Sequence, residues 1–163
     1  MEAATSESKL EDVGPGAGLV RPLAQSVEAA VHWAQDAPDG DGLMINDAEF
    51  LAGIGRLLTQ MEGSACTPTA MGKIIGSDTV RLGFERLIDL VGPAATLSHG
   101  ADGAIGDGII EFGHRYAQIS ATPGGTVEVF RTIIAQHDLG LPRPDYPGRR
   151  VFLTGERQGT AAA

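Results

Sequence analysis

The sequence predicts an all-α protein, an up-and-down helical bundle, and three observations lead to this prediction. Apolar residues recur at intervals of three and four over most of the chain, which is the period of an amphipathic helix. Short clusters rich in Gly, Pro and Asp separate these stretches, and no good strand periodicity is present. Only 5% of the 163 residues are aromatic, so the core is built mainly from Leu, Ile, Val and Ala. Such a core suits packed helices better than a β-sandwich.

The first predicted helix covers residues 19–35. Its apolar residues form a broad stripe, and Pro22 lies in the first turn, where its missing N–H costs little. Residues 1–16 are small and polar and end in the breaker run GPGAG, so we expect them to form a flexible N-terminal arm. A turn cluster, DAPDGDG, occupies residues 36–42 and ends this helix.

Two longer helices are predicted next. Asn46 or Asp47 can cap the second, which ends near residues 62–69. Thr67 or Thr69 starts the third, which runs to the strong stop signal Gly92-Pro93. The apolar positions of the second helix are Phe50, Leu51, Ile54, Leu57 and Leu58, and those of the third are Ile74, Ile75, Val80, Leu82, Phe84, Leu87, Ile88 and Val91.

The last third of the chain predicts a loop, two short helices and a tail. Residues 94–108 are rich in Gly and Ala and are typical of an open loop, and 109–119 form a fourth helix. In the fifth, Val129, Ile133, Ile134 and Leu139 form one stripe, which Gly140 closes. The tail, residues 145–163, contains one strand-like segment at 150–155. The bundle domain is therefore expected to cover residues 17–144.

Composition limits the classes of function. A net charge of −9 at pH 7 and a pI near 4.7 argue against binding to a phosphate backbone. The single cysteine, Cys66, excludes an internal disulfide and is typical of a reducing compartment. No apolar run approaches the roughly 18 residues that span a bilayer, and the acidic N-terminus lacks the apolar region of a signal peptide. These features predict a cytoplasmic protein that binds neither nucleic acid nor membrane.

Other reactive side chains favour structural roles. The four histidines lack the spacing of metal ligands, so we predict no metal site. Cys66 is expected to be a buried or incidental thiol, and Arg115 to pair with a carboxylate. The carboxylates Glu85 and Asp89, four residues apart on one helix, are typical of a solvated face.

The start of the fifth helix, Gly124-Gly125-Thr126, has two interpretations. The two glycines and Thr126 as N-cap can simply form a tight turn. Alternatively, the glycines allow the backbone to approach a ligand, to which Thr126 offers a hydroxyl group and the helix start its free N–H groups.

The same stretch closely resembles a known family. Residues 124–143, GGTVEVFRTIIAQHDLGLPR, are similar to the last helix of bacterial acyl-CoA dehydrogenases, which end in runs like GGTxEIxRxIIAxxxLGLPR. Upstream, GKIIGSDTVRLGFERLIDLVGPAA resembles the long third helix of the family's C-terminal bundle, and DAPDGDGLMINDAEFLAGIGRLL resembles the turn and helix before it. FGHRYAQIS is similar to the short arginine-bearing helix before the active-site turn. The resemblance covers roughly residues 17–144.

The resemblance implies part of a flavoprotein. Family members have an N-terminal helical domain, a middle β-domain and a C-terminal four-helix bundle, and this chain resembles the bundle alone. FAD lies between the domains and across a subunit interface, and a glutamate removes the α-proton of acyl-CoA while a hydride passes to the flavin. The chain is therefore expected to be a C-terminal domain or small subunit that shares FAD in a homo- or hetero-oligomer of such subunits.

The resemblance also implies site residues. Gly124, Gly125, Thr126 and Glu128 would contribute to the flavin and acyl edge, whereas Asp89, Leu90, Val91 and Gly92 would approach the FAD of a neighbouring subunit.

Two departures from the family's pattern oppose full activity. Many members carry the catalytic glutamate where this chain has Gly124, and Glu11, ahead of the first helix, is the other candidate base. Asp89 replaces a common Gln and adds negative charge near a diphosphate, while Pro93 removes an N–H donor. We therefore expect no activity from the chain alone. The alternative is a non-catalytic helical module, derived from the family, that serves dimerisation or partner binding.

Overall fold

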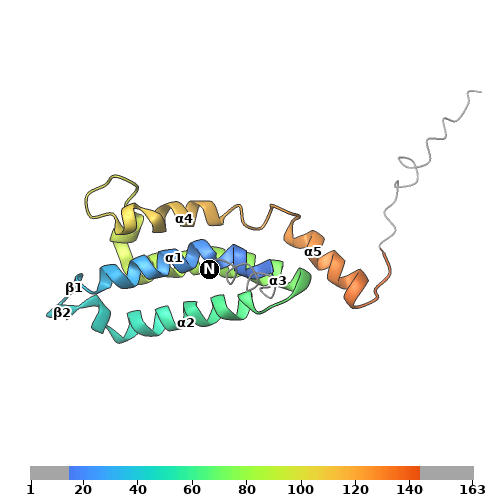
Figure 1. Cartoon of the computed structure of the whole chain (residues 1–163), viewed down its shortest axis with the longest axis horizontal. Coiled ribbons are helices and arrows are strands. Elements are labelled where there is room, and N and C mark those ends of the chain that lie inside the picture. The colour runs from blue at the N-terminus through green and yellow to red at the C-terminus, as the bar shows by residue number, and fades with distance from the viewer. Residues whose placement is uncertain (1–14, 144–163) are drawn as a thin grey trace, which may run out of the picture.

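The structure, a computed structural model, describes residues 15–143 and is helical almost throughout (Figure 1). Its helices are α1 (Pro15–Ala34), α2 (Ala48–Ala65), α3 (Thr69–Val91), α4 (Ile109–Ala117) and α5 (Val127–Ile133), which continues into a π-helical turn, η4 (Ile134–Asp138). Three 3₁₀ turns lie at Met44–Asn46, Gly92–Thr96 and Ile105–Asp107, and two-residue strands β1 (Pro38–Asp39) and β2 (Gly42–Leu43) pair antiparallel. The all-α prediction is confirmed.

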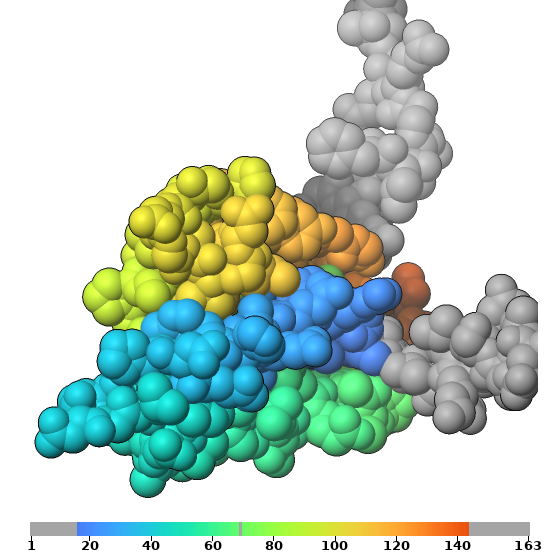
Figure 2. Space-filling model, turned by 60° about the vertical axis from the view of Figure 1, so that its left-hand side comes forward, coloured from blue at the N-terminus to red at the C-terminus, as the bar shows by residue number. Residues whose placement is uncertain are grey.

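Helix α3 is the centre of the bundle. It packs against α1, α2, α4 and α5, and α1 also contacts α2 and α4. In Figure 1, α4 and α2 lie on opposite sides of the α1–α3 pair, while α5 lies beyond the end of α4. The space-filling view shows α2, α1 and α4 stacked in one continuous body (Figure 2).

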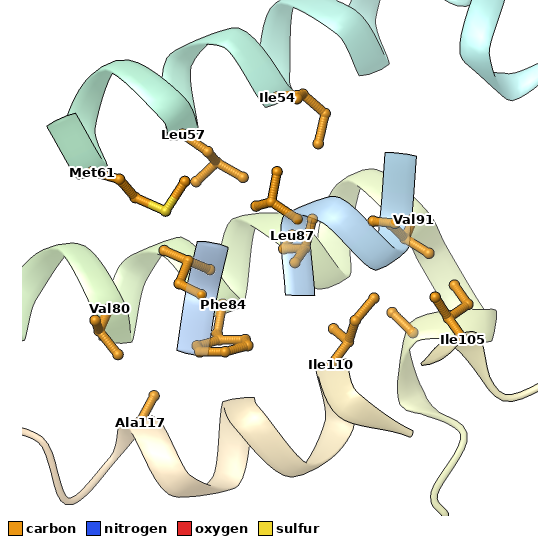
Figure 3. Packing of buried hydrophobic residues seen from close by; sticks show 14 of the residues in the cluster. Ile54, Leu57, Met61, Val80, Phe84, Leu87, Val91, Ile105, Ile110 and Ala117 are labelled. Atoms are coloured by element: carbon orange, nitrogen blue, oxygen red, sulfur yellow. The ribbon is translucent and has the colours of Figure 1, made fainter. Parts of the chain in front are cut away.

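The core is formed by apolar side chains from the first four helices. Phe84 and Leu87 of α3 have no exposed surface, and they lie between α2 and α4 (Figure 3). Around them are the buried side chains of Leu23, Val27, Ala30, Phe50, Ile54, Leu57, Met61, Val80, Val91, Ile105, Ile110 and Ala117. The stripes predicted for the second and third helices are thus buried in part, but four of their positions are exposed: Leu51, Leu58, Ile75 and Leu82.

Glycines allow three of the helix contacts to be close. A Cβ atom at Gly83 of α3 would overlap the side chain of Leu23 of α1, and one at Gly53 of α2 would overlap Leu90 of α3. A Cβ atom at Gly113 of α4 would overlap the ring of Phe84. Each large side chain fills space that the opposite helix leaves open, which is how helices with small residues approach one another.

Most helix boundaries follow the sequence signals, but the predicted start of the first helix is wrong, because α1 begins at Pro15 and Pro22 lies inside it. Asp47 caps α2, where its Oδ1 accepts a hydrogen bond of 2.6 Å from the N–H of Phe50. Helix α3 begins at Thr69, but its N-cap is Pro68 and no side chain caps it. The segment 94–108 is less open than predicted, because its two 3₁₀ turns place Ala95 and Ile105 in the core.

The predicted stripe of the fifth helix is wrong. Val129, Ile133 and Leu139 are 50%, 38% and 67% exposed, whereas Val127 is buried. Helix α5 packs mainly against α3, so only one narrow side of it is covered. The π-helical turn after Ile133 also changes the period on which the prediction relied. The strand-like segment at 150–155 and residues 1–14 lie outside the described residues.

Candidate functional site

A buried lysine and a serine on α3 hold the turn that leads into α5. The Lys73 Nζ donates a hydrogen bond of 2.6 Å to the carbonyl oxygen of Ser120, and the Ser77 Oγ donates one of 3.1 Å to the same oxygen. In return, the Ser120 Oγ donates to the Ser77 carbonyl at 3.4 Å. Lys73 and Ser77 are four residues apart and thus share one face of α3. The sequence analysis did not identify them, although a lysine beside two isoleucines was a signal.

The anchored turn carries the glycine pair. The φ angles of Gly124 and Gly125 are +76° and +116°, which side chains of L-residues rarely adopt. A Cβ atom at Gly124 would meet no atom within 4 Å, whereas one at Gly125 would lie 3.2 Å from the ring of Phe130. Backbone conformation alone therefore explains both glycines, and the surface beside Gly124 is open.

Thr126 is the N-cap of α5, as predicted. Its Oγ1 accepts a hydrogen bond of 3.4 Å from the N–H of Val129. Glu128, in the first turn, is exposed and lies 4.0 Å from the guanidinium of Arg131. The backbone N–H of Glu128 and the Thr126 hydroxyl lower the pKa of the Glu128 carboxyl. The Glu128 carboxylate is therefore a weaker base than an ordinary glutamate.

The side chains of this turn offer only a weak base. Gly124 supplies no carboxylate, and lowering the pKa of Glu128 reduces its ability to take a proton. The open surface at Gly124 and the Thr126 hydroxyl are suited to contact with the edge of a flat ligand. Glu11 lies outside the described residues.

The other predicted group lies at the far end of α3. Asp89 is exposed, but Val91 is 5% exposed in the core and Leu90 packs against Gly53. Gly92, with φ of +75°, donates its N–H to the carbonyl of Ile88 as the C-cap. At about 1.5 Å per residue, Asp89 is roughly 24 Å along the helix from Lys73. The structure therefore does not bring the two predicted groups together.

The Asp89 end is mixed to acidic in charge. A groove of about 440 Å³ between α2 and α3 is lined by Glu49, Gly53, Arg56, Gln60, Arg86, Asp89 and Leu90. The Arg86 guanidinium donates a 2.9 Å hydrogen bond to Gln60. Next to it, a hollow of about 320 Å³ is lined by Asp39, Met44, Asp47, Glu49, Phe50, Asp89 and Leu90. Four carboxylates in that lining, without a cation among them, do not suit the diphosphate of FAD.

Other candidate groups have structural partners. Arg115 pairs with Glu111, which raises the pKa of the arginine and lowers that of the glutamate. Of the two roles expected for Cys66, a buried or an incidental thiol, the first is wrong, because Cys66 is exposed. Its Sγ lies 3.6 Å from the carboxylate of Glu62. Within residues 15–143, no group of three or more His, Cys, Asp or Glu side chains is arranged so that it could hold a metal ion. In the same range, no helix is both long and apolar enough to cross a membrane.

The chain is similar to acyl-CoA dehydrogenases in sequence and in fold. It is 28% identical over 142 residues to acyl-CoA dehydrogenase FadE26 of Mycobacterium tuberculosis, covering 75% of this chain and 36% of that protein. The ChsE4-ChsE5 complex from the same organism matches with a TM-score of 0.68 and 28% identity, over 76% of this chain and 36% of the matched chain. No protein-family profile matches.

A further solved structure, the Tcur3481-Tcur3483 steroid ACAD, matches with a TM-score of 0.68 at 23% identity, over 79% of this chain and 36% of that one, and supports the fold alone. The chain thus spans about a third of the length of the relatives that it matches. The chain therefore has the fold of the C-terminal helical domain of acyl-CoA dehydrogenases and resembles proteins of this family in sequence.

Proposed function

We propose that this chain is the C-terminal domain, or a small subunit, of an acyl-CoA dehydrogenase-like flavoprotein. The likeness in both sequence and fold to one third of such enzymes is the observation that carries the proposal. The assembled protein would perform FAD-dependent α,β-dehydrogenation of an acyl-CoA thioester. The acyl group would belong to a fatty acid or a steroid side chain.

The turn at Gly124–Thr126 would contact the flavin edge. FAD, when bound, would supply the acceptor for the hydride that leaves the acyl chain. The open surface at Gly124 and the Thr126 hydroxyl fit contact with a flat ring. The carboxylates around Asp89 do not fit the FAD diphosphate. Another domain or subunit would therefore hold that part of the cofactor.

The chain would be inactive alone. An α-proton requires a carboxylate within hydrogen-bonding reach, and the usual position of that carboxylate is Gly124. With φ of +76°, this position is strained for any side chain. The base would come from the partner, with Glu11 as the candidate within this chain.

A non-catalytic, partner-binding module is the alternative. It is favoured by the glycine-specific backbone at Gly124 and by apolar side chains that the bundle leaves exposed. These are Leu51 and Leu58 on α2, Ile75 and Leu82 on α3, and Phe112 and Tyr116 on α4. Such faces usually become covered by a partner, here an acyl-CoA dehydrogenase-type subunit or a second copy.

Co-expression tests the proposal. The full chain is purified alone and together with acyl-CoA dehydrogenase subunits encoded beside its gene. We expect the chain alone to be colourless and unable to reduce a dye with acyl-CoA, and the complex to co-elute with bound flavin. A monomer by light scattering that co-elutes with none of these subunits would overturn it.

Two variants separate the alternatives. If Gly125→Val lowers the flavin content of the complex while the helical circular dichroism is unchanged, the turn contacts the cofactor. Wild-type flavin content in that variant would favour the non-catalytic module. If the chain alone instead reduces the dye, and this activity disappears in Glu11→Gln, Glu11 is identified as the base. That result would contradict the proposed inactivity of the chain alone.

A further inference from the structure

A small cavity, lined in part by the buried Lys73, lies between α1, α3, α4 and the turn after α4. Its volume is about 230 Å³. Of its lining residues, Lys73, Val80, Phe84 and Gly113 are buried, Leu19, Pro22 and Ser120 are half-buried, and Gly18, Tyr116, Ile119 and Pro123 are exposed. Of these lining residues, only Lys73 carries a charge. The cavity is therefore an apolar space with one cationic group.

The Lys73 amine has donors to spare. A lysine ammonium carries three N–H donors, and the hydrogen bond to the Ser120 carbonyl uses one. Within residues 15–143, Lys73 forms no ion pair with a carboxylate. The side chain is only 7% exposed, so water cannot fully replace a partner. A buried charge without a counter-ion is costly, and burial accordingly lowers the pKa of the Lys73 ammonium.

Anchoring of the turn does not by itself account for a lysine. The hydroxyl group of Ser77 already donates to the same carbonyl oxygen at 3.1 Å, and Ser120 returns a hydrogen bond to Ser77. These neutral groups hold the turn without burying a charge. A cation at this place is better explained by an anionic group that enters the cavity.

We propose that this cavity binds a small monocarboxylate, whose oxygens accept hydrogen bonds from Lys73 and whose apolar body packs against Val80 and Phe84. A charge-assisted hydrogen bond in a poorly hydrated site is among the stronger polar contacts. The volume is below the roughly 300–1,000 Å³ of pockets for drug-sized ligands, so the ligand is correspondingly small. The site does not depend on the function proposed above.

The carboxylate has two possible sources. One is a free acid, and the other is an acidic side chain of residues 1–14, which include Glu11 and Asp12 and directly precede α1. Both sources offer the same chemistry to Lys73, so the test must distinguish them.

Binding of hexanoate to the full chain, followed by ligand-observed NMR, is the test. Hexanamide, which has the same length without the charge, serves as the matched probe. We expect hexanoate to bind about tenfold more tightly or better, as the loss of one hydrogen bond to a charged group predicts. Equal affinity for the two probes would overturn the proposal.

Three variants locate the site. Lys73→Met removes the amine. Gly18→Leu places a side chain at an exposed lining residue and keeps the amine, because a Cβ atom at Gly18 meets no atom within 4 Å. Each should weaken hexanoate binding by about tenfold or more. Gly55→Leu is the matched control, since Gly55 is equally open but lies on α2 outside the cavity. Unchanged binding in Gly18→Leu would overturn the assignment even if Lys73→Met failed to fold.

The double variant Glu11→Gln/Asp12→Asn identifies the source. Hexanoate binding that tightens about fivefold or more would indicate competition by the chain's own carboxylates. Unchanged affinity would indicate a free acid. Absence of hexanoate binding at millimolar concentration, both in the wild type and in this variant, would overturn the proposal.

Lysine labelling provides a second readout. The sequence contains two lysines, Lys9 and Lys73. Hexanoate should slow the reductive methylation of Lys73, measured by peptide mass spectrometry, and leave that of Lys9 unchanged. Equal rates with and without hexanoate at Lys73 would contradict binding at this amine.

Discussion

The ring of Phe84 on α3 occupies the space above Gly113 of α4, where any other residue would place its Cβ atom. Gly113→Ala should therefore destabilise the fold by about 1–3 kcal/mol, because the buried ring of Phe84 must shift to admit the added methyl group. Urea denaturation measures the change in the free energy of unfolding.

Gly63→Ala is the matched control for that substitution. Gly63 lies in α2, and a Cβ atom there meets nothing within 4 Å. Its replacement should stabilise the protein by about 0.5–1 kcal/mol through helix propensity. Similar effects of the two substitutions would contradict the close approach of α3 and α4.

Gly124 and Gly125 of the turn should differ in how much stability is lost when each is replaced by alanine. At Gly124, alanine incurs only the strain of a positive φ, about 1–2 kcal/mol. At Gly125, it incurs backbone strain and also a Cβ contact of 3.2 Å with Phe130. The melting temperature of Gly125→Ala should therefore be lower than that of Gly124→Ala. The reverse order would contradict the backbone angles and the Phe130 contact described for this turn.

Loss of the α5 cap should have a local effect. Thr126→Ala removes the acceptor for the Val129 N–H and should cost about 1 kcal/mol. Thr126→Ser keeps the hydroxyl and should be nearly neutral. Amide hydrogen exchange should become faster in the first turn of α5 in the alanine variant alone. Faster exchange throughout the bundle would argue against a local cap.

Lys73 should make stability depend on pH at alkaline values. Burial lowers its pKa from 10.5, so between the lowered value and 10.5 the unfolded chain binds one more proton than the folded chain. Stability then rises with pH across this window. The stability gained from the neutral amine is fully present above pH 10.5, and it is lost as the pH falls through the pKa of Lys73 in the folded chain.

Urea denaturation of the wild type and of Lys73→Met, from about pH 7 upwards, measures this contribution as the difference between their free energies of unfolding. The wild type should gain stability relative to the variant as pH rises. A difference that is constant over the whole range would exclude the buried, desolvated amine.

Local signals predicted the helices well, and tertiary contacts explain what they missed. Asp47 and Gly92 mark helix ends through their own side chain or backbone, so the sequence alone identifies them. The exposed side of α5 depends instead on how little of it α3 covers. The role of Lys73 depends on Ser120, which is 47 residues away in the sequence. A lysine is ordinarily expected in solvent, and only the folded chain shows that this one is buried.

The attachment of α5 to essentially one neighbour has a consequence for local unfolding. Opening α5 breaks contacts with α3 but leaves the α1–α2–α3–α4 core intact, so it requires less free energy than global unfolding. Native-state hydrogen exchange should thus show residues 127–138 as a separate unit that opens first. The turn with the glycine pair joins this unit to the core, so we expect it to act as the hinge and the opening to stop at the Lys73–Ser120 hydrogen bond.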